Sequence, residues 1–311
     1  MFIILEGGVT INFSKLDLQD YNFVQKFLEE YEVINSKMSF VNLYAYEHFH
    51  GPSIGRNYTD KLVILSNPEE VEPAFFPPLC KMDELEKTIN EMKNYYSSRF
   101  GKTMKIKECG EDFIEKIKKC GFSFTREKVR EQWEYIYRVE DLADLSGREM
   151  HKKKNRANKF EREHPNYVFR EMKDDDKSRV LEFYDYWCTF RNCEEDKNLA
   201  YERKALETLF VLKKMDYPVE GGIGFDGDRM VGYVLGTELN SKVFVVLSEK
   251  GELDKEYEGV YSVLNRDIAR QILGRCDLLN LQQDLGIEGL RKSKLSWKPE
   301  LLLVCDVVCI P

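Results

Sequence analysis

The sequence predicts an α/β protein of two tandem halves, each built around a mixed sheet. The 311 residues suffice for two domains of ordinary size. Hydrophobic residues make up 42% of the chain and aromatic residues 13%, which is enough to fill packed cores. Helical and strand periodicities follow one another along both halves without strict alternation, which is typical of mixed sheets.

The first half begins with a helical pattern at 18–31, in which Phe23, Phe27 and Leu28 share one face. An aromatic-rich segment follows at 39–46. The other elements predicted here are strands at 61–66, 73–78 and 131–138 and helices at 82–99 and 111–120. The second of these helices stops at Gly121, as a helix C-terminus should.

The chain changes character near 141–147, and we place the domain boundary there. The predicted domains are therefore residues 1–145 and residues 146–311. A basic helix at 148–163 opens the second domain. It ends at His164 because Pro165 disfavours a helical conformation in its predecessor.

The element order of the second half suits an acyltransferase-type mixed sheet. The predicted strands are 167–171, 221–225, 230–239, 242–247, 277–282 and 300–310, and the helices are 177–190, 199–214, 259–274 and 287–294. A doubly wound dinucleotide-binding fold would alternate strictly. The chain also has no Gly-x-Gly-x-x-Gly and no phosphate-loop lysine motif.

Composition excludes several classes of protein. The net charge of −8 argues against general nucleic-acid binding, although a local basic patch remains compatible with it. No run of about 18 apolar residues predicts a membrane span, and the apolar run at 1–6 is too short for a signal peptide. We therefore expect a cytoplasmic protein with reduced thiols; peripheral membrane contact and oligomeric state stay open. Four histidines without paired spacing predict no metal site.

The basic helix is the first candidate for function. Between Arg148 and Glu163 seven Lys/Arg residues face three Glu residues. On a helix Lys152, Arg156 and Lys159 form one stripe, which would attract donor phosphates together with the neighbouring Lys153. The alternative is a solvated helix face.

The second candidate is the strand end and helix at 280–299. Asp284 follows a predicted strand and can cap the next helix. A cleft at this strand end would receive two cations, Arg291 and Lys294, and we predict that Gln282 joins them in binding the donor. Asp284 is a candidate catalytic acid or base. The alternatives are a simple helix cap and solvated cations.

Glu238 is the third candidate, because it lies near the end of a central strand. A glutamate there could act as a general base on an attacking amine if burial raised its pKa. The alternative is a solvated side chain.

Five segments resemble the phosphatidylglycerol lysyltransferase C-terminal-like family, also called DUF2156. Four lie in the second half, at 147–160, 202–205, 258–261 and 284–296, and one lies at 39–44. The run from Asp-Leu-Gly to Lys-x-Ser within 284–296 is the most specific. Together the segments span most of the chain.

The resemblance implies two tandem acyl-CoA N-acyltransferase-like (GNAT) domains. For the lysyltransferases it implies aminoacyl transfer from aminoacyl-tRNA to a lipid head group. This chain departs from the family pattern at Leu281 and Gln282, where acid and base groups often stand, and at 248–251, where a histidine often stands. It also has Glu256 and Glu258 where acyl-CoA transferases bind a pyrophosphate at a helix start.

The leading hypothesis is therefore an acyl- or aminoacyl-transferase that uses acyl-CoA or aminoacyl-tRNA as donor and an amine or hydroxyl acceptor. The basic helix would hold the tRNA or CoA phosphates. A non-catalytic GNAT-fold module for a polyanion or a protein partner is the alternative. A plain acetyl-CoA-dependent acetyltransferase is the third hypothesis.

Overall fold

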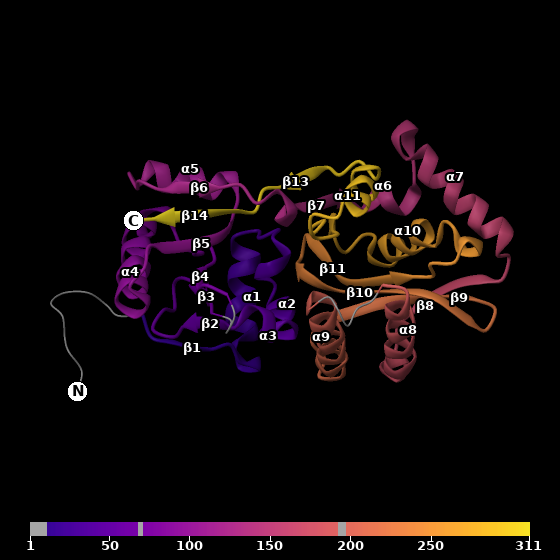
Figure 1. Cartoon of the computed structure of the whole chain (residues 1–311), viewed down its shortest axis with the longest axis horizontal. Helices are drawn as coiled ribbons and strands as arrows, with labels where there is room; N and C mark the ends of the chain where they lie inside the picture. The colour runs from indigo at the N-terminus through magenta and orange to yellow at the C-terminus, as the bar shows by residue number, and fades with distance from the viewer. Residues whose placement is uncertain (1–10, 68–70, 192–196) are drawn as a thin grey trace. The chain divides into compact units, whose positions relative to one another are not determined.

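The computed structural model describes residues 11–67, 71–191 and 197–311, and it divides them between two compact units (Figure 1). The first unit combines residues up to Tyr31 with Glu47–Trp133 and Val304–Pro311, and the second combines Glu32–Tyr46 with Glu134–Leu303. The chain thus passes from the first unit to the second between Trp133 and Glu134. The domain boundary predicted between residues 145 and 146 stays a prediction. The apolar run at 1–6 lies outside the described ranges.

The first unit is built on a seven-stranded mixed sheet. Its strands, in spatial order, are β1 (Phe13–Lys15), β2 (Pro52–Gly55), β3 (Ile64–Ser66), β4 (Ala74–Phe75), β5 (Met104–Cys109), β14 (Asp306–Ile310) and β6 (Thr125–Glu127). Among these seven described strands, only β4 and β5 pair in parallel. The α-helices are α1 (Tyr21–Glu30), α3 (Glu47–His50), α4 (Met82–Phe100) and α5 (Glu111–Lys119). The buried faces of α4 and α5 supply much of its core.

The second unit is also built on a seven-stranded mixed sheet. Its strands, in spatial order, are β13 (Leu301–Leu303), β7 (Glu134–Arg138), β12 (Leu278–Asn280), β11 (Val243–Gly251), β10 (Arg229–Asn240), β9 (Val219–Asp226) and β8 (Tyr167–Glu171). Within the described part of this sheet, only β11 and β12 pair in parallel. On one face lie α6 (Val139–Asp144), α7 (Gly147–Glu163) and α10 (Val260–Ile272), and on the other lie α8 (Lys177–Thr189) and α9 (Lys197–Lys214) (Figure 1). Two more helices are α2 (Phe40–Ala45) and α11 (Glu288–Leu295).

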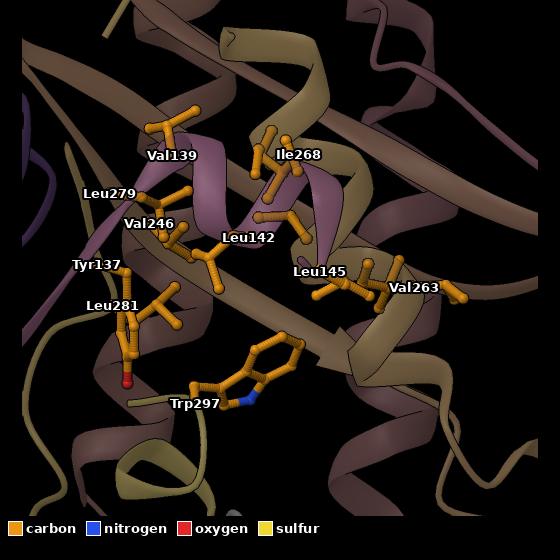
Figure 2. Close-up of a cluster of buried hydrophobic side chains, with 14 of the residues drawn as sticks. Tyr137, Val139, Leu142, Leu145, Val246, Val263, Ile268, Leu279, Leu281 and Trp297 are labelled. Carbon is orange, nitrogen blue, oxygen red and sulfur yellow. The ribbon is translucent and has the colours of Figure 1, made fainter. Parts of the chain in front are cut away.

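The main core of the second unit lies under α6 and α10. Figure 2 shows Leu142 of α6 among side chains of α10 and the sheet, with Leu281 and Trp297 at one end of the cluster. Each fully buried aliphatic side chain of this kind stabilises the fold by about 1.5–3 kcal/mol. The core therefore holds the loop that contains Leu281 and the turn that contains Trp297 in fixed positions.

The predicted mixed α/β class is confirmed. Several elements, among them β1, β2, β5, β6 and α6, were not predicted, and two predicted strands of the second half differ from the structure. The strand predicted at 300–310 is two strands, β13 and β14, in different sheets. Asp306 anchors β14 in the first unit, because its carboxylate accepts hydrogen bonds from Trp133 Nε1 at 2.9 Å and Arg126 Nε at 2.7 Å. The strand predicted at 277–282 ends at Asn280, since Gln282 has a φ of +58°, outside the strand region.

The strands β11 and β12 separate soon after they meet. They pair only from Val243 to Val245, whereas β11 continues to Gly251. A bulge on the other side of β11 leaves Leu247 without a cross-strand partner in β10. Because the pairing with β12 stops at Val245, the edge of β11 on the β12 side is open from Val246 onward.

Three further features concern membranes, metals and thiols. Across the described ranges, no helix has both the length and the apolar character needed to cross a membrane. Those ranges also contain no group of three or more His, Cys, Asp or Glu side chains suited to a metal ion. The expectation of reduced thiols is wrong at Cys188, which is disulfide-bonded, while the six other cysteines within the described ranges are free.

Candidate functional site

The open edge of β11 carries polar side chains in sequence positions 248–250. Ser248 Oγ and Lys250 Nζ point to one face, where both donate to Glu202 Oε1, at 3.0 and 2.6 Å. Glu249 points to the other face, because side chains alternate along a strand. There Asn265 Nδ2 of α10 donates to Glu249 Oε1 at 2.6 Å.

Glu249 is a half-buried carboxyl group with an altered pKa. Burial raises its pKa from 4.5 to about 7, against the opposing influence of Lys294, Lys250 and Lys153. Among the residues that the structure describes, none forms an ion pair with it within 4.0 Å. A carboxyl group that titrates near neutral pH can accept a proton from a substrate and release it again.

Lys294 of α11 approaches the same place from the end of β12. Its Nζ donates to Leu281 O at 2.5 Å and to Gln283 O at 2.6 Å. Burial lowers its pKa to about 8, with Glu249 acting in the opposite direction. The sequence predicted Lys294 as a donor-binding residue, and its nearest contacts are these two backbone carbonyls.

Gln282 bridges the gap between the separated strands. Its Nε2 donates to Val246 O at 2.6 Å, which satisfies an acceptor on the open edge of β11. Its own N–H donates to Asn280 Oδ1 at 2.7 Å, and this turn requires the positive φ of Gln282. The residue predicted to bind donor therefore already has partners for both its side-chain amide and its backbone.

Asp284 is the centre of a buried clamp. Arg291 donates to both of its oxygens at 2.9 Å, Tyr135 OH donates at 2.6 Å and Gly286 N donates at 2.9 Å. Burial by itself would raise the pKa of Asp284, but these hydrogen bonds outweigh it and hold the pKa well below 3.8. This arrangement suits a residue that positions the loop better than one that accepts a proton.

The basic helix α7 divides its cations between two faces. Lys152 and Arg156 are exposed and form no ion pair within the described part of the chain, whereas Lys159 lies 3.9 Å from Glu163 and 3.6 Å from a glutamate before α10. Lys153 points inward and is only 5% exposed. Its Nζ lies 4.2 Å from the centre of the Trp297 ring, and burial lowers its pKa to about 8.

Glu238 lies at a different place in the sheet. Its carboxylate forms an ion pair with Arg275 at 3.3 Å. In the pairing of β10 with β11, Glu238 lies opposite Phe244, whereas the residue of β10 opposite Glu249 is Val234. Four residues of β10 separate the two positions, which corresponds to about 13 Å. The structure therefore brings Lys294 and Asp284 together in the loop and helix after β12, sets Lys153 against Trp297, and leaves Glu238 apart from Glu249.

The start of α10 is covered by another helix. Gly259, the N-cap, has a φ of +110°, and a β-carbon added there would come within 3.1 Å of Arg156 O. Glu258 is exposed beside it and interacts with Lys159. A carbonyl and a carboxylate therefore occupy the surroundings in which a pyrophosphate would need hydrogen-bond donors.

Two buried acceptor atoms lie among these residues without a partner. Asn265 Oδ1 and Gln283 Oε1 accept no hydrogen bond within the described ranges. An unsatisfied buried polar group usually costs about 1–3 kcal/mol, so such atoms commonly mark a place where a ligand binds. Both could accept hydrogen bonds from an amine or a hydroxyl group.

Sequence reasoning missed Glu249 and Asn265. The available signal was the polar run 248–251 at the end of an otherwise apolar strand, which drew attention only as a departure from a family pattern. Nothing in the local sequence indicates that Glu249 faces α10, because the bulge at Leu247 decides which side chains point to which face.

Comparison with known proteins agrees with this architecture. The family model "Phosphatidylglycerol lysyltransferase, C-terminal" matches residues 28–303. The chain belongs to this family. The resemblance inferred from the five sequence segments is thereby confirmed.

Among curated proteins, an uncharacterized protein of Mycoplasmoides gallisepticum is 24% identical over 182 residues, which is 56% of each chain. The chain thus matches about half the length of that relative. Among solved structures, a conserved protein of unknown function from Bacteroides thetaiotaomicron is 25% identical, with a TM-score of 0.88, over 97% of this chain and all of the other.

Two further solved structures share the fold at low identity. L-PGS from Bacillus licheniformis is 12% identical with a TM-score of 0.62, over 95% of this chain and 92% of the other. A tandem GNAT protein from the clavulanic acid biosynthesis pathway is 8% identical with a TM-score of 0.51, over 96% and 98%. These likenesses confirm the predicted resemblance to tandem GNAT structures.

Proposed function

We propose that the chain is an acyl- or aminoacyl-transferase whose reaction takes place beside the open edge of β11, with Glu249 as the general base. The observation that carries the proposal is the half-buried Glu249 carboxyl, whose pKa is raised to about 7 and which, among the described residues, accepts a hydrogen bond from Asn265 alone. The membership of the lysyltransferase family supports the reaction class.

The proposed reaction has two parts. The acceptor's amine or hydroxyl attacks the carbonyl carbon of the acyl group, and Glu249 takes up its proton. A new C–N or C–O bond forms, and the bond from the carbonyl carbon to the donor's oxygen or sulfur breaks. That leaving atom takes up a proton, so charge and atoms balance. Asn265 Oδ1 and Gln283 Oε1 would orient the acceptor through its N–H or O–H groups.

An aminoacyl-tRNA suits this donor site better than acyl-CoA. The exposed cations Lys152 and Arg156 face outward from α7, where a phosphate backbone could lie along them. The start of α10 is covered by α7 and carries Glu258, which disfavours a pyrophosphate there. The name of the matching family, phosphatidylglycerol lysyltransferase, also indicates transfer of an aminoacyl group, and we extend that to this chain as part of the proposal.

The proposal is tested by replacing Glu249 with glutamine. The assay supplies labelled total aminoacyl-tRNA or acyl-CoA as donor and an extract of small molecules and lipids as acceptor. Removal of a general base typically costs 10²–10⁴-fold, so we expect Glu249→Gln to lower kcat by at least about 100-fold. Glu256→Gln, an exposed change close to α10, serves as the matched control and should leave the rate within about twofold.

Two outcomes would contradict the proposal. A folded Glu249→Gln protein with unchanged turnover would remove the general-base role. Tight binding of tRNA by the wild-type chain, without transfer from either donor class, would favour a non-catalytic binding module instead.

A further inference from the structure

Lys294 is held by main-chain carbonyl groups and not by a carboxylate. Its ammonium group donates to Leu281 O at 2.5 Å and to Gln283 O at 2.6 Å. A lysine ammonium has three donors, and within the described ranges the third has no protein acceptor. The side chain is neither fully buried nor exposed. One N–H of a partly covered ammonium group is therefore left for a ligand.

The turn at Gln282 brings both carbonyl groups to this one ammonium group. In an extended strand two carbonyls on the same side lie about 7 Å apart, too far to share a nitrogen. Gln282 has a φ of +58°, which bends the chain between Leu281 and Gln283. Its N–H is held by Asn280 Oδ1 and its side-chain amide by Val246 O. The ammonium group is thus fixed next to the turn that contacts β11 where the open edge begins.

Glu249 is the carboxyl group around Lys294 with spare acceptor capacity. The other titratable groups around the pair are Lys250 of β11, Glu134 and Tyr135 of β7, Asp284 of the loop after β12, and Lys153 of α7. Glu134 accepts three hydrogen bonds and Asp284 four from other residues, and Lys250 is paired with a glutamate at 2.6 Å. Among the described residues only Asn265 donates to Glu249.

Glu249 and Lys294 act on each other without forming an ion pair. Each is the strongest charged influence on the pKa of the other, yet no N···O distance between them is within 4.0 Å. In acyl transfer the attacking and leaving atoms are bonded to one carbon. With a hydrogen bond of about 2.6–3.2 Å at each atom, the base oxygen and the acid nitrogen lie roughly 5–8 Å apart. A separation beyond contact distance therefore suits two groups on either side of one reacting carbonyl.

We propose that Lys294 is the catalytic acid of the transfer reaction, and that its remaining N–H gives a proton to the leaving oxygen of the donor. This role rests on the proposed transferase function. As the tetrahedral intermediate collapses, the bond from the carbonyl carbon to the leaving oxygen breaks, and the electron pair stays on that oxygen. Lys294 supplies the proton and becomes a neutral amine, while Glu249 holds the proton of the acceptor. Solvent carries a proton from Glu249 to Lys294, so charge and atoms balance.

An acid at this place matters most for an oxygen ester. A thiol has a pKa of about 8.5, so a thiolate leaves without being protonated, whereas an alkoxide is a much stronger base. Burial lowers the pKa of Lys294 to about 8, which makes it a better proton donor than an ordinary lysine. Lys294 is therefore of most use with a ribose ester, such as that of an aminoacyl-tRNA.

The test compares two donors that carry the same aminoacyl group on different leaving groups. Aminoacyl-tRNA releases a ribose hydroxyl, and an aminoacyl p-nitrophenyl ester releases an anion that needs no proton. Glycinamide is the acceptor amine, and each rate is corrected for the uncatalysed reaction. We expect Lys294→Met to lower transfer from aminoacyl-tRNA by at least about 100-fold, and transfer from the p-nitrophenyl ester by less than about fivefold.

Two further variants separate proton transfer from charge and from folding. Lys294→Arg keeps the positive charge but also its proton, because the guanidinium pKa is above about 12, so we expect the same selective loss. Lys292→Met changes an exposed lysine of the same helix and should leave both rates within about twofold.

The pH profile gives a second readout. The acid works when protonated, so transfer from aminoacyl-tRNA by the wild-type chain should fall as pH rises through about 8. Lys294→Met should lack this fall, which a merely structural role would not remove.

Three results would overturn the acid role: equal losses of Lys294→Met with both donors, no loss with aminoacyl-tRNA, or restored aminoacyl-tRNA transfer in Lys294→Arg. Glu249→Gln separates this proposal from that of the general base, since loss of the base should slow both donors. Equal losses in Lys294→Met would leave Glu249 as the base. Failure of the wild-type chain to transfer from either donor would instead refute the transferase function on which the acid role rests.

Discussion

At the scale of single residues, two carboxyl groups removed from bulk water have pKa values displaced in opposite directions. Burial acts on both Glu249 and Asp284 by raising the pKa. Asp284 receives a bidentate arginine, a tyrosine hydroxyl and a backbone N–H, and its pKa falls. Glu249 receives one amide N–H, and its pKa rises to about 7. The number of donors, and not burial alone, decides whether the pKa of a buried carboxyl group falls or rises.

The pKa of Glu249 predicts the pH dependence of transfer. The base works when ionised, so kcat/KM should rise with pH through about 7, and not through 4.5 as for an ordinary glutamate. Lys294 stabilises the ionised form, so Lys294→Met should move this midpoint to higher pH. The measurement is kcat/KM from pH 5 to 9. The control is Lys292→Met, which changes an exposed lysine less than one helical turn from Lys294 and should leave the midpoint in place. A midpoint near pH 4.5 in the wild-type chain would contradict the role of Glu249 as the base.

At the scale of elements, α7 has two separate roles. Its inward face places Met150, Ala157 and Phe160 in the core and brings Lys153 to Trp297. Its outward face presents cations that the nearby carboxylates neutralise only in part. The predicted stripe of Lys152, Arg156 and Lys159 therefore has the exposure that polyanion binding requires, and that role stays a prediction.

Charge reversal tests the outward face of α7. The variant Lys152→Glu/Arg156→Glu/Lys159→Glu should weaken binding of unacylated tRNA by at least about tenfold. It should also reduce the slope of log Kd against log salt by about 2, because phosphate contacts release counterions. The matched control is Lys116→Glu/Lys118→Glu/Lys119→Glu on α5, another exposed set of lysines. Equal losses in both variants would indicate only a general charge effect.

At the scale of the whole molecule, the second unit depends on a segment taken from far earlier in the chain. Residues Glu32–Tyr46 belong to it, more than 80 residues before Glu134. Asn240 Nδ2 donates to Val33 O at 2.7 Å, and Asn280 Nδ2 donates to Ile34 O at 2.9 Å. Tyr46 OH donates to Leu247 O at 3.5 Å, so the segment extends to the bulge beside the candidate site.

Glu134 is the buried anchor of this segment. It accepts hydrogen bonds from Ser36 N at 2.9 Å, from the Ser36 hydroxyl and from Asn280 Nδ2 at 2.7 Å. Glu134→Ala would leave these donors unsatisfied, and we expect it to lower the free energy of unfolding by about 3 kcal/mol. Chemical denaturation measures the loss. Glu300→Ala, which removes an exposed partner of Arg138, should change stability by less than about 0.5 kcal/mol, and similar losses in the two variants would rule out the anchor.

The sequence by itself determined the class of the fold, most helices and strands of the second half, the family, and the segment 284–296 near which the candidate site lies. These properties follow from periodicity, turn residues and short motifs, all of which act over a few neighbouring residues. The same local signals identified Lys153, Lys294 and Asp284 as residues of interest without distinguishing their roles.

Only the tertiary structure decided which groups have partners. Asp284 lies in a clamp with Tyr135, a residue about 150 positions away, and Lys153 turns inward to Trp297. Glu249 became the candidate base because the separation of β11 and β12 opens one edge beside it. Burial, donor number and the division of the chain between two units arise from contacts distant in sequence, and the proton affinity of a side chain depends on those contacts.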